Sequence, residues 1–352
     1  MKRATCFGWL ASLLCVAHAA AHDLPVSYLD LRVGETGIDA TLETSAKNLA
    51  REVGGRDAEV LLQQPETQRQ EFLALAASRI RIDADGILSH PEVREITALP
   101  ARRDLRLHLF YPFRRPPDQI SVTFGFFSSD PRHQTFLNLY RGEALKHQDI
   151  LRDAGVTHSY SLARQQSTLA VIRQFVREGV HHIFIGPDHI LFVVGLLLLG
   201  GTIGQLCKIV TAFTVAHSLT LGLATLNLVT PPADLIEPAI ALSIVFVGAH
   251  AILFRAPSRD WRLLFAFGFG FIHGFGFANV LGAMELPRDA LGWSLFSFNF
   301  GVEIGQVCIV LAVAPALALL ARRSAPLARR VVTASSFGVV AAGAFWLTQR
   351  LQ

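Results

Sequence analysis

Six apolar segments in the C-terminal half of the chain most limit what it can fold into. Each is long enough to cross the hydrocarbon core of a bilayer, which takes about 20 residues of α-helix. The segments are residues 183–201, 207–228, 234–254, 261–284, 290–321 and 330–349. The fifth is longer, so we expect that helix to be tilted or broken. Together they predict an α-helical polytopic membrane protein with about six transmembrane helices.

The first 21 residues have the pattern of a secretory signal peptide. Lys2 and Arg3 precede the apolar run FGWLASLLCVA, and AHAAA supplies small residues for cleavage. We expect cleavage after Ala21 or after Ala19; the alternative is an uncleaved anchor helix. The signal places residues 22–165 outside the cytoplasm, and they contain no cysteine, so this region must fold without disulfides.

Residues 22–165 are predicted to form an exported, mainly antiparallel β-sandwich-like domain. Five segments alternate in polarity or are rich in β-branched and aromatic residues, with Gly and Pro between them. These segments are 26–33, 38–44, 105–113, 119–127 and 134–141. A helical stretch is expected at 66–77. An amphipathic linker helix at 166–182 is expected to lead into the transmembrane helical domain, residues 183–352.

Basic residues in the loops indicate orientation, because cytoplasmic loops are enriched in Lys and Arg. If the first span starts outside, every inner loop is basic. The outer loop 229–233 then has no basic residue, and the outer loop 285–290 has one Arg. The inner-loop residues are Lys208, Arg255, Arg259, Arg262, Arg322, Arg323, Arg329 and Arg330. We therefore expect a multi-pass protein of a bacterial-type inner membrane with both ends outside. Because no nucleic-acid motif is present, the expected partner is the lipid bilayer and not nucleic acid.

Polar side chains interrupt five of these spans, although such groups are costly at membrane depth and tend to be functional there. Imidazole and carboxylate groups together bind divalent transition metals. We expect a shared metal or proton site; the alternative is a set of structural hydrogen bonds between helices. The candidate metal ligands are His182, Asp188, His189, His217, His273 and Glu303. Further polar residues in the spans are Glu237, His250, Asn299 and Gln306.

The first span places two of these histidines on one helical face. His182 and His189 are seven residues apart, which is two turns. Gly186-Pro187 between them is expected to disturb the helix, since proline removes a backbone hydrogen bond. Non-helical backbone at this depth is tolerated where it lines a cavity. Asp188 either binds the ion or accepts a hydrogen bond from an imidazole, and the spacing leaves both open.

Glycines surround the histidine of the fourth span. Small residues let helices approach closely, and the alternative is that backbone lies near a bound ion. The glycines are Gly268, Gly270, Gly274 and Gly276.

Four histidines of the region before the spans are further candidates for metal binding. His22 would be a chelator through its amine and imidazole if cleavage made it the N-terminus. His133, His147 and His158 could help to collect metal; the alternative is that they are ordinary surface histidines.

Five blocks in order resemble the HupE/UreJ family of membrane proteins. They are GVHHIFIGPDHILF, VTAFTVAHSLTLGLATL, ALSIVFVGAH, FGFIHGFGFA and FNFGVEIGQ. The opening HDLPVSYLDLRV resembles the exported domain of the longer members. The resemblance implies nickel or cobalt uptake, and partners in metal handling or metalloenzyme maturation, because the family is associated with hydrogenase and urease genes. The long-known nickel/cobalt permeases carry His, four residues, then Asp-His; here five residues separate His182 from Asp188-His189.

Two main functional hypotheses follow. The first is a permease for a divalent transition metal, with nickel or cobalt as substrate. His182, Asp188 and His189 would receive the ion from outside, and His217, His273 and Glu303 would hold it midway. No nucleotide-binding motif is present, so transport would be secondary or channel-like.

The second hypothesis is an intramembrane zinc-dependent hydrolase. Three histidines would hold zinc with one open position, and Glu303 or Asp188 would be the general base. A third reading is a membrane anchor that presents the exported domain to a partner. It leaves the buried polar residues without a role.

Overall fold

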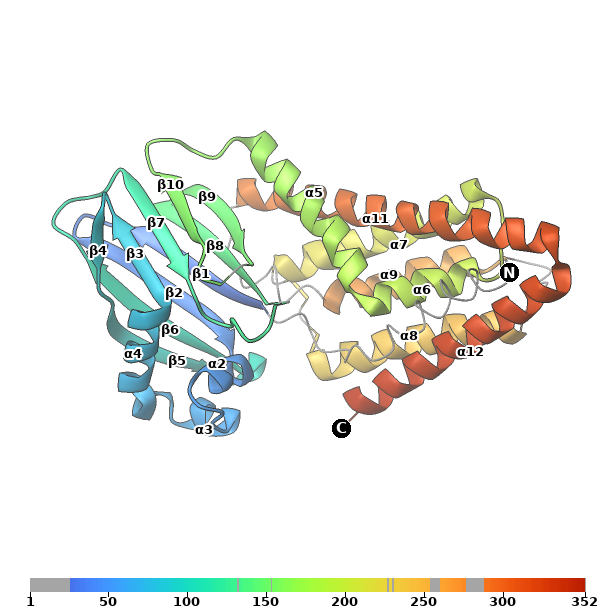
Figure 1. The fold of residues 1–352 in the computed structure, drawn as a ribbon, viewed down its shortest axis with the longest axis horizontal. Coiled ribbons are helices and arrows are strands. Elements are labelled where there is room, and N and C mark those ends of the chain that lie inside the picture. The colour runs from blue at the N-terminus through green and yellow to red at the C-terminus, as the bar shows by residue number, and fades with distance from the viewer. Residues whose placement is uncertain are drawn as a thin grey trace, which may run out of the picture. The chain divides into compact units, whose positions relative to one another are not determined.

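A computed structural model describes residues 26–131, 133–152, 154–226, 228–229, 231–253, 260–276 and 288–351 (Figure 1). The chain divides between Ser167 and Thr168 into two compact units. The predicted signal peptide, His22, most of the inner loop 255–262, residues 285–287 of the outer loop and the end of the fourth predicted span lie outside the described residues.

The first unit is built on two β-sheets. The six-stranded sheet has the order β5-β6-β2-β1-β8-β9 and the four-stranded sheet the order β10-β7-β3-β4. Their strands are β1 (Val26–Val33), β2 (Gly37–Ser45), β3 (Ile80–Ala84), β4 (Ile87–Ser89), β5 (Glu92–Leu99), β6 (Asp104–Pro112), β7 (Gln119–Phe124), β8 (Gln134–Arg141), β9 (Ala144–Leu151) and β10 (Thr157–Ser161). Every described pairing is antiparallel except that of β1 with β8. That pair is parallel, which the long connection between them permits.

Both sheets contribute to one hydrophobic core. Leu29 and Leu31 of β1 are fully buried together with Ile82 of β3 and Val122 of β7. These residues alternate with polar ones along each strand, as a half-buried strand requires. The helical stretch expected at 66–77 is part of a longer helical insertion between β2 and β3. It contains α2 (Ala46–Glu52), α3 (Ala58–Gln63), the 3₁₀ helix η2 (Pro65–Gln68) and α4 (Arg69–Arg79).

A group of charges on the six-stranded sheet surrounds the buried Glu43 carboxylate. The Glu43 carboxylate pairs with Arg102 at 3.1 Å and with Arg106 at 2.7 Å. Burial raises the pKa of the neighbouring Asp104 carboxyl to about 7; repulsion from Glu43 adds to this shift and Arg102 opposes it. Asp104 therefore favours a proton in the folded state.

The second unit is helical. It contains α5 (Thr168–Ile185), α6 (Pro187–Leu197), α7 (Ile203–Thr225), α8 (Ala233–Leu253), α9 (Arg262–Gly276), α11 (Arg288–Arg323) and α12 (Ala325–Arg350). By length and composition, four described helices can cross a membrane, or five if α5 and α6 form one broken span. The described part of α9 is shorter, because it stops where the described residues stop.

The expected disturbance at Gly186-Pro187 is confirmed. Helix α5 ends at Ile185, α6 begins at Pro187, and the two are bent by 74°. The predicted boundary between a linker helix and the first span, at 182/183, falls inside α5. Of the two alternatives for the long fifth span, a broken helix is wrong, since the 36 residues of α11 continue through Pro315.

Glycines allow the helices to approach closely at two crossings. A Cβ on Gly179 of α5 would lie 2.7 Å from the backbone nitrogen of Val302 on α11. A Cβ on Gly274 of α9 would lie 2.6 Å from the carbonyl oxygen of His217 on α7. Two of the fourth-span glycines, Gly270 and Gly274, therefore contact α7, whereas Gly268 has open space around it.

We expect Gly274→Ala to destabilise the helical unit. The added methyl meets backbone that cannot move aside, and overpacking of this kind costs about 1–3 kcal/mol. Gly268→Ala on the same helix is the matched control, and it should be neutral or stabilising by up to about 1 kcal/mol, because alanine favours helix. Thermal unfolding of the purified protein in detergent measures both. Equal midpoints for the two variants would contradict the close crossing.

We expect Asp104→Asn to flatten the pH dependence of stability in the β-sheet unit. The pKa of Asp104 is about 7 when folded and about 4 when unfolded. The folded state therefore binds the proton more tightly. This contribution is fully present below about pH 4 and is lost as the pH rises through about 7.

Urea unfolding of residues 22–167, followed by circular dichroism from pH 4 to pH 8, measures the free energy of unfolding. The wild type should lose stability across this range relative to Asp104→Asn. Asp39→Asn changes an exposed aspartate, and it should retain the wild-type slope. Parallel curves for wild type and Asp104→Asn would refute the assignment.

Candidate metal site

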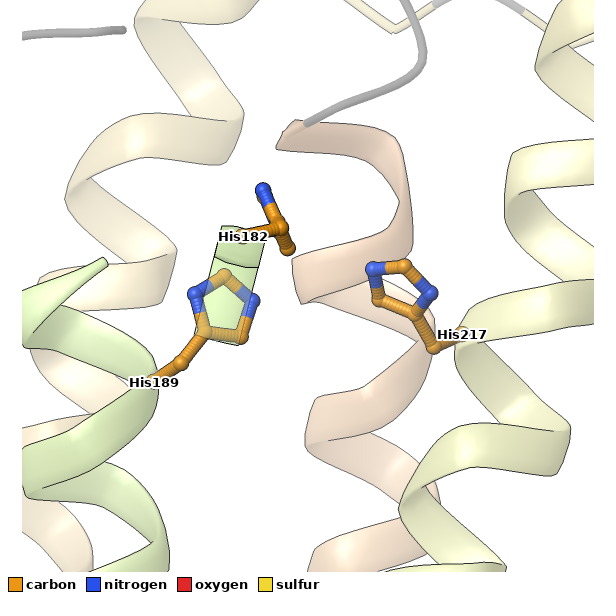
Figure 2. Close-up of side chains that lie close together, drawn as sticks. All are labelled: His182, His189 and His217. Atoms are coloured by element: carbon orange, nitrogen blue, oxygen red, sulfur yellow. The ribbon is translucent and has the colours of Figure 1, made fainter. Parts of the chain in front are cut away.

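Three buried histidines from three helices form the candidate site. His182 lies in the last turn of α5, His189 in the first turn of α6, and His217 in the middle of α7. Each offers one ring nitrogen, and these nitrogens all lie within 4.8 Å of one another (Figure 2). All three residues are less than one tenth exposed. The cluster therefore has the donors and the spacing to share one metal ion.

The broken helix brings two of these histidines together. In a continuous helix, seven residues would separate His182 from His189 by about 10 Å along the axis. The break reduces the distance between their ring centroids to 4.7 Å. Gly186 at the break has an extended conformation, and a Cβ there would lie 2.9 Å from Nδ1 of His189. Pro187 is suited to the first position of α6, where no backbone donor is needed.

Asp188 determines which nitrogen of His189 can bind an ion. Its Oδ1 lies 3.1 Å from Nδ1 of His189 and also accepts from the His189 backbone N–H at 2.9 Å. Nδ1 therefore carries the hydrogen. Nε2 of His189 is buried and has no hydrogen-bond partner among the described residues. Its lone pair remains available, as in carboxylate–histidine pairs at metal sites.

Asn299 has the same role toward His217. Its Nδ2 donates to the carbonyl of Leu295 at 2.9 Å, so Oδ1 faces His217 and lies 3.0 Å from Nδ1. Nδ1 of His217 must then donate. Nε2 of His217 is buried, and within the described part of the chain nothing hydrogen-bonds to it. A second lone pair is therefore available at the cluster.

His273 lies beside the cluster on α9. Its ring centroid is 5.2 Å from that of His189. Ser243 donates its hydroxyl hydrogen to the carbonyl of Ile240 at 2.7 Å, so it accepts from Nε2 of His273 at 2.9 Å. Nδ1 of His273 thus has a free lone pair, and this buried atom has no hydrogen-bond partner in the described ranges. His273 is a further donor next to the three mutually close histidines.

The structure places Glu303 apart from the histidines. Its carboxylate oxygens contact the hydroxyls of Thr211 at 2.6 Å and Thr214 at 2.5 Å. His250 is also apart, because its ring lies against Phe246 and Phe265. A span's apolar pattern gives the depth of such residues in the membrane but not which neighbouring helix they face.

Three polar residues around the site were not assigned a role from the sequence. Asn299 and Ser243 hold imidazoles, and Nη2 of Arg350 lies 3.9 Å from Oδ2 of Asp188. Arg350 also donates to the carbonyl of Glu237 at 2.9 Å. Asn299 could have been found from the sequence, because it is a polar residue in the block FNFGVEIGQ. Ser243 lies in an apolar segment, and no sequence pattern distinguishes it from other serines.

The histidines of the first unit have other environments. His133 is buried and stacks on Phe127, with 3.8 Å between ring centroids. Its Nε2 forms a hydrogen bond with the Ser27 hydroxyl, so His133 is not a surface histidine. Burial lowers the pKa of His133 to about 3. His158 contacts Asp149 at 2.9 Å, and His147 donates to the carbonyl of Ser161 at 2.7 Å. The described residues of this unit contain no group of three close metal-binding side chains.

The sequence model of a protein family described as HupE / UreJ protein matches residues 158–350. The match covers the whole described helical unit, including the four histidines and Glu303. No curated protein and no solved structure matches the chain.

We expect Asn299→Leu to weaken metal binding about 10- to 100-fold, because the partner that orients a ligating imidazole is lost. Asn299→Asp retains an acceptor for Nδ1 of His217 and should bind metal at least as well as the wild type. Calorimetric titration of the purified protein with nickel measures both. Equal affinity in Asn299→Leu and wild type would show that Asn299 does not orient a ligand.

Proposed function

Since this chain belongs to the HupE/UreJ family, we propose that it is a permease for a divalent transition metal, with nickel or cobalt as its substrate. One observation carries the proposal. His189 and His217 each have one ring nitrogen held by a protein acceptor, while the other nitrogen is buried and has no hydrogen-bond partner among the described residues. Both residues also belong to the group of three histidines that can share one metal ion. Leaving such atoms unsatisfied costs about 1–3 kcal/mol each. A bound cation removes that cost.

The broken span supports transport. Transporter sites commonly lie near the bilayer midplane where a helix is discontinuous, and the break at Gly186 lies between two of the histidines. His182 and His189 receive the ion at the outer side of the path. His217 completes the site, and the lone pair of His273 beside His189 offers the next position. Asp188 acts through His189, because its Oδ1 lies 3.1 Å from Nδ1 of that ring.

The membrane topology that fits this path has six spans with both ends outside. The α5–α6 pair is the first span, α9 lies in the fourth, and α7, α8, α11 and α12 are the others. The mainly antiparallel β unit is then an exported, sandwich-like domain, delivered by a signal peptide to the outer side of the inner membrane. From there it could pass metal to the site or contact metal-handling partners.

The hydrolase alternative has less support. Three histidines can hold catalytic zinc, but the reaction also needs a base beside the open position. Asp188 is engaged with His189, and Glu303 is engaged with Thr211 and Thr214. Neither described carboxylate is arranged as that base.

We expect His189→Ala to abolish uptake of radioactive nickel and cobalt without loss of protein from the membrane, because one donor of the cluster is removed. His250→Ala is the matched control, since it removes an imidazole from another part of the same helical unit. Uptake by cells that express each variant, normalised to protein in the membrane, measures the effect.

Unchanged uptake in His189→Ala would refute the permease with this site. Bound zinc that does not exchange, together with hydrolysis of a lipid or peptide, would favour the enzyme instead. Metal that exchanges and enters vesicles containing the purified protein would favour the permease.

A further inference from the structure

A half-buried carboxyl group of the helical unit, that of Glu303, is hydrogen-bonded only to uncharged groups among the described residues. Oε1 of Glu303 contacts the Thr211 hydroxyl, and Oε2 contacts the Thr214 hydroxyl. The described ion pairs of this unit join Arg262 to Asp260, and Arg350 and His189 to Asp188; none includes Glu303. An ionised carboxylate without a cation is costly at membrane depth.

The hydrogen atoms at Thr214 do not suffice for an ionised Glu303 in this arrangement. The Thr214 oxygen lies 2.5 Å from Oε2 of Glu303, 3.0 Å from Oε1 of Gln306 and 3.2 Å from the carbonyl of Val210. All three partners are acceptors, and a threonine hydroxyl carries one hydrogen. A proton on Glu303 resolves the shortage, because Glu303 then donates to Thr214 and Thr214 donates to Gln306.

Gln306 supplies the complementary arrangement. Its side chain is fully buried, and Nε2 has no hydrogen-bond partner within the described residues. If the amide turns over, Nε2 donates to the Thr214 oxygen, Thr214 donates to Glu303, and the carboxylate can be ionised. The same heavy atoms thus accommodate Glu303 with and without its proton.

This carboxyl lies one helical turn from the metal site on the same two helices. On α7, Thr214 precedes His217 by three residues; on α11, Glu303 follows Asn299 by four. His217 and Asn299 are themselves hydrogen-bonded. A divalent cation at the histidines therefore acts on Glu303 at short range and through a medium of low dielectric constant, where charges interact strongly.

Other titratable or charged groups lie on α11 and on the helices packed against it, so the experiment must separate them from Glu303. These described residues are Arg173, Arg177, Glu178, His181 and His182 on α5, Asp188 and His189 on α6, Cys207, Lys208 and His217 on α7, Cys308, Arg322 and Arg323 on α11, and Arg329, Arg330 and Arg350 on α12. Glu178 is a buried carboxyl on α5, a helix that packs against α11.

We propose that Glu303 is a proton-binding site that releases its proton when a metal ion occupies the histidines. The ion's charge favours the carboxylate, the proton leaves for water, and Gln306 turns its amide toward Thr214. When the ion leaves, the carboxyl takes up a proton again. Metal movement is thereby exchanged against a proton. This inference rests on the proposed function and adds the identity of the coupling ion.

The test is calorimetric titration of the purified full-length protein with nickel in two buffers that differ in ionisation enthalpy. The difference in heat gives the number of protons released per ion bound. Metal binding to deprotonated groups releases protons, and the wild type should release about one from Glu303. Glu303→Gln should bind nickel and release about none, whereas Glu303→Asp should restore the release.

Glu178→Gln is the matched control and should release protons like the wild type. Equal release by Glu303→Gln and wild type would overturn the inference, as would loss of release in Glu178→Gln alone. If Glu303→Gln fails to fold, Glu303→Ala tests the same loss of the carboxyl, and an unchanged proton count in that variant would overturn the inference. Absence of nickel binding in the wild type would instead refute the proposed function.

Discussion

Backbone polar groups inside a bilayer must find partners within the protein, and this requirement makes the break at Gly186 the feature on which the candidate site depends. A continuous helix would keep His182 and His189 two turns apart. The break ends α5 with a hydrogen bond from the Gly186 N–H to the carbonyl of His182, and Pro187 starts α6 without needing an acceptor. The chain thus turns at membrane depth without leaving these groups unsatisfied, and the turn brings the imidazoles together.

Three imidazoles in and beside the cluster are held in the same way. A different acceptor holds one nitrogen of each of three imidazoles: a carboxylate for His189, an amide for His217 and a hydroxyl for His273. Each acceptor is fixed by another contact, so the ring orientations do not depend on a bound ion. Close glycine crossings hold α7 against α9, which keeps His217 and His273 on neighbouring backbones.

Local sequence signals were sufficient for part of this structure. The β-rich first unit, the apolar helices and the disturbance at Gly186-Pro187 follow from alternation, hydropathy and proline chemistry. The spacing of His182 and His189 predicted one shared helical face, whereas the break between them brings their rings to 4.7 Å between centroids. The parallel pairing of β1 with β8 does not follow from local signals, because the signal for a strand says nothing about a partner about a hundred residues away.

The position of Glu303 shows where such reasoning stops. Depth along a span placed it level with His217 and His273, but the rotation of α11 directs its side chain to Thr211 and Thr214 instead. The rotation of α11 about its axis is determined by helix packing, here by the contacts of Gly301 and Gly305 with α5. No pattern in a single sequence predicts this rotation. Ser243 and Arg350 were missed for the same reason.

The three fixed imidazoles do not present equivalent atoms. His189 and His217 offer Nε2, the nitrogen far from the backbone, whereas His273 offers Nδ1, the nitrogen near it. An ion that passes from His189 to His273 would leave an Nε2 ligand for an Nδ1 ligand. It would thereby come closer to the axis of α9, which carries His273. With paramagnetic cobalt as substrate, the two positions would shift different ring protons, so nuclear magnetic resonance could distinguish where the ion resides along its path.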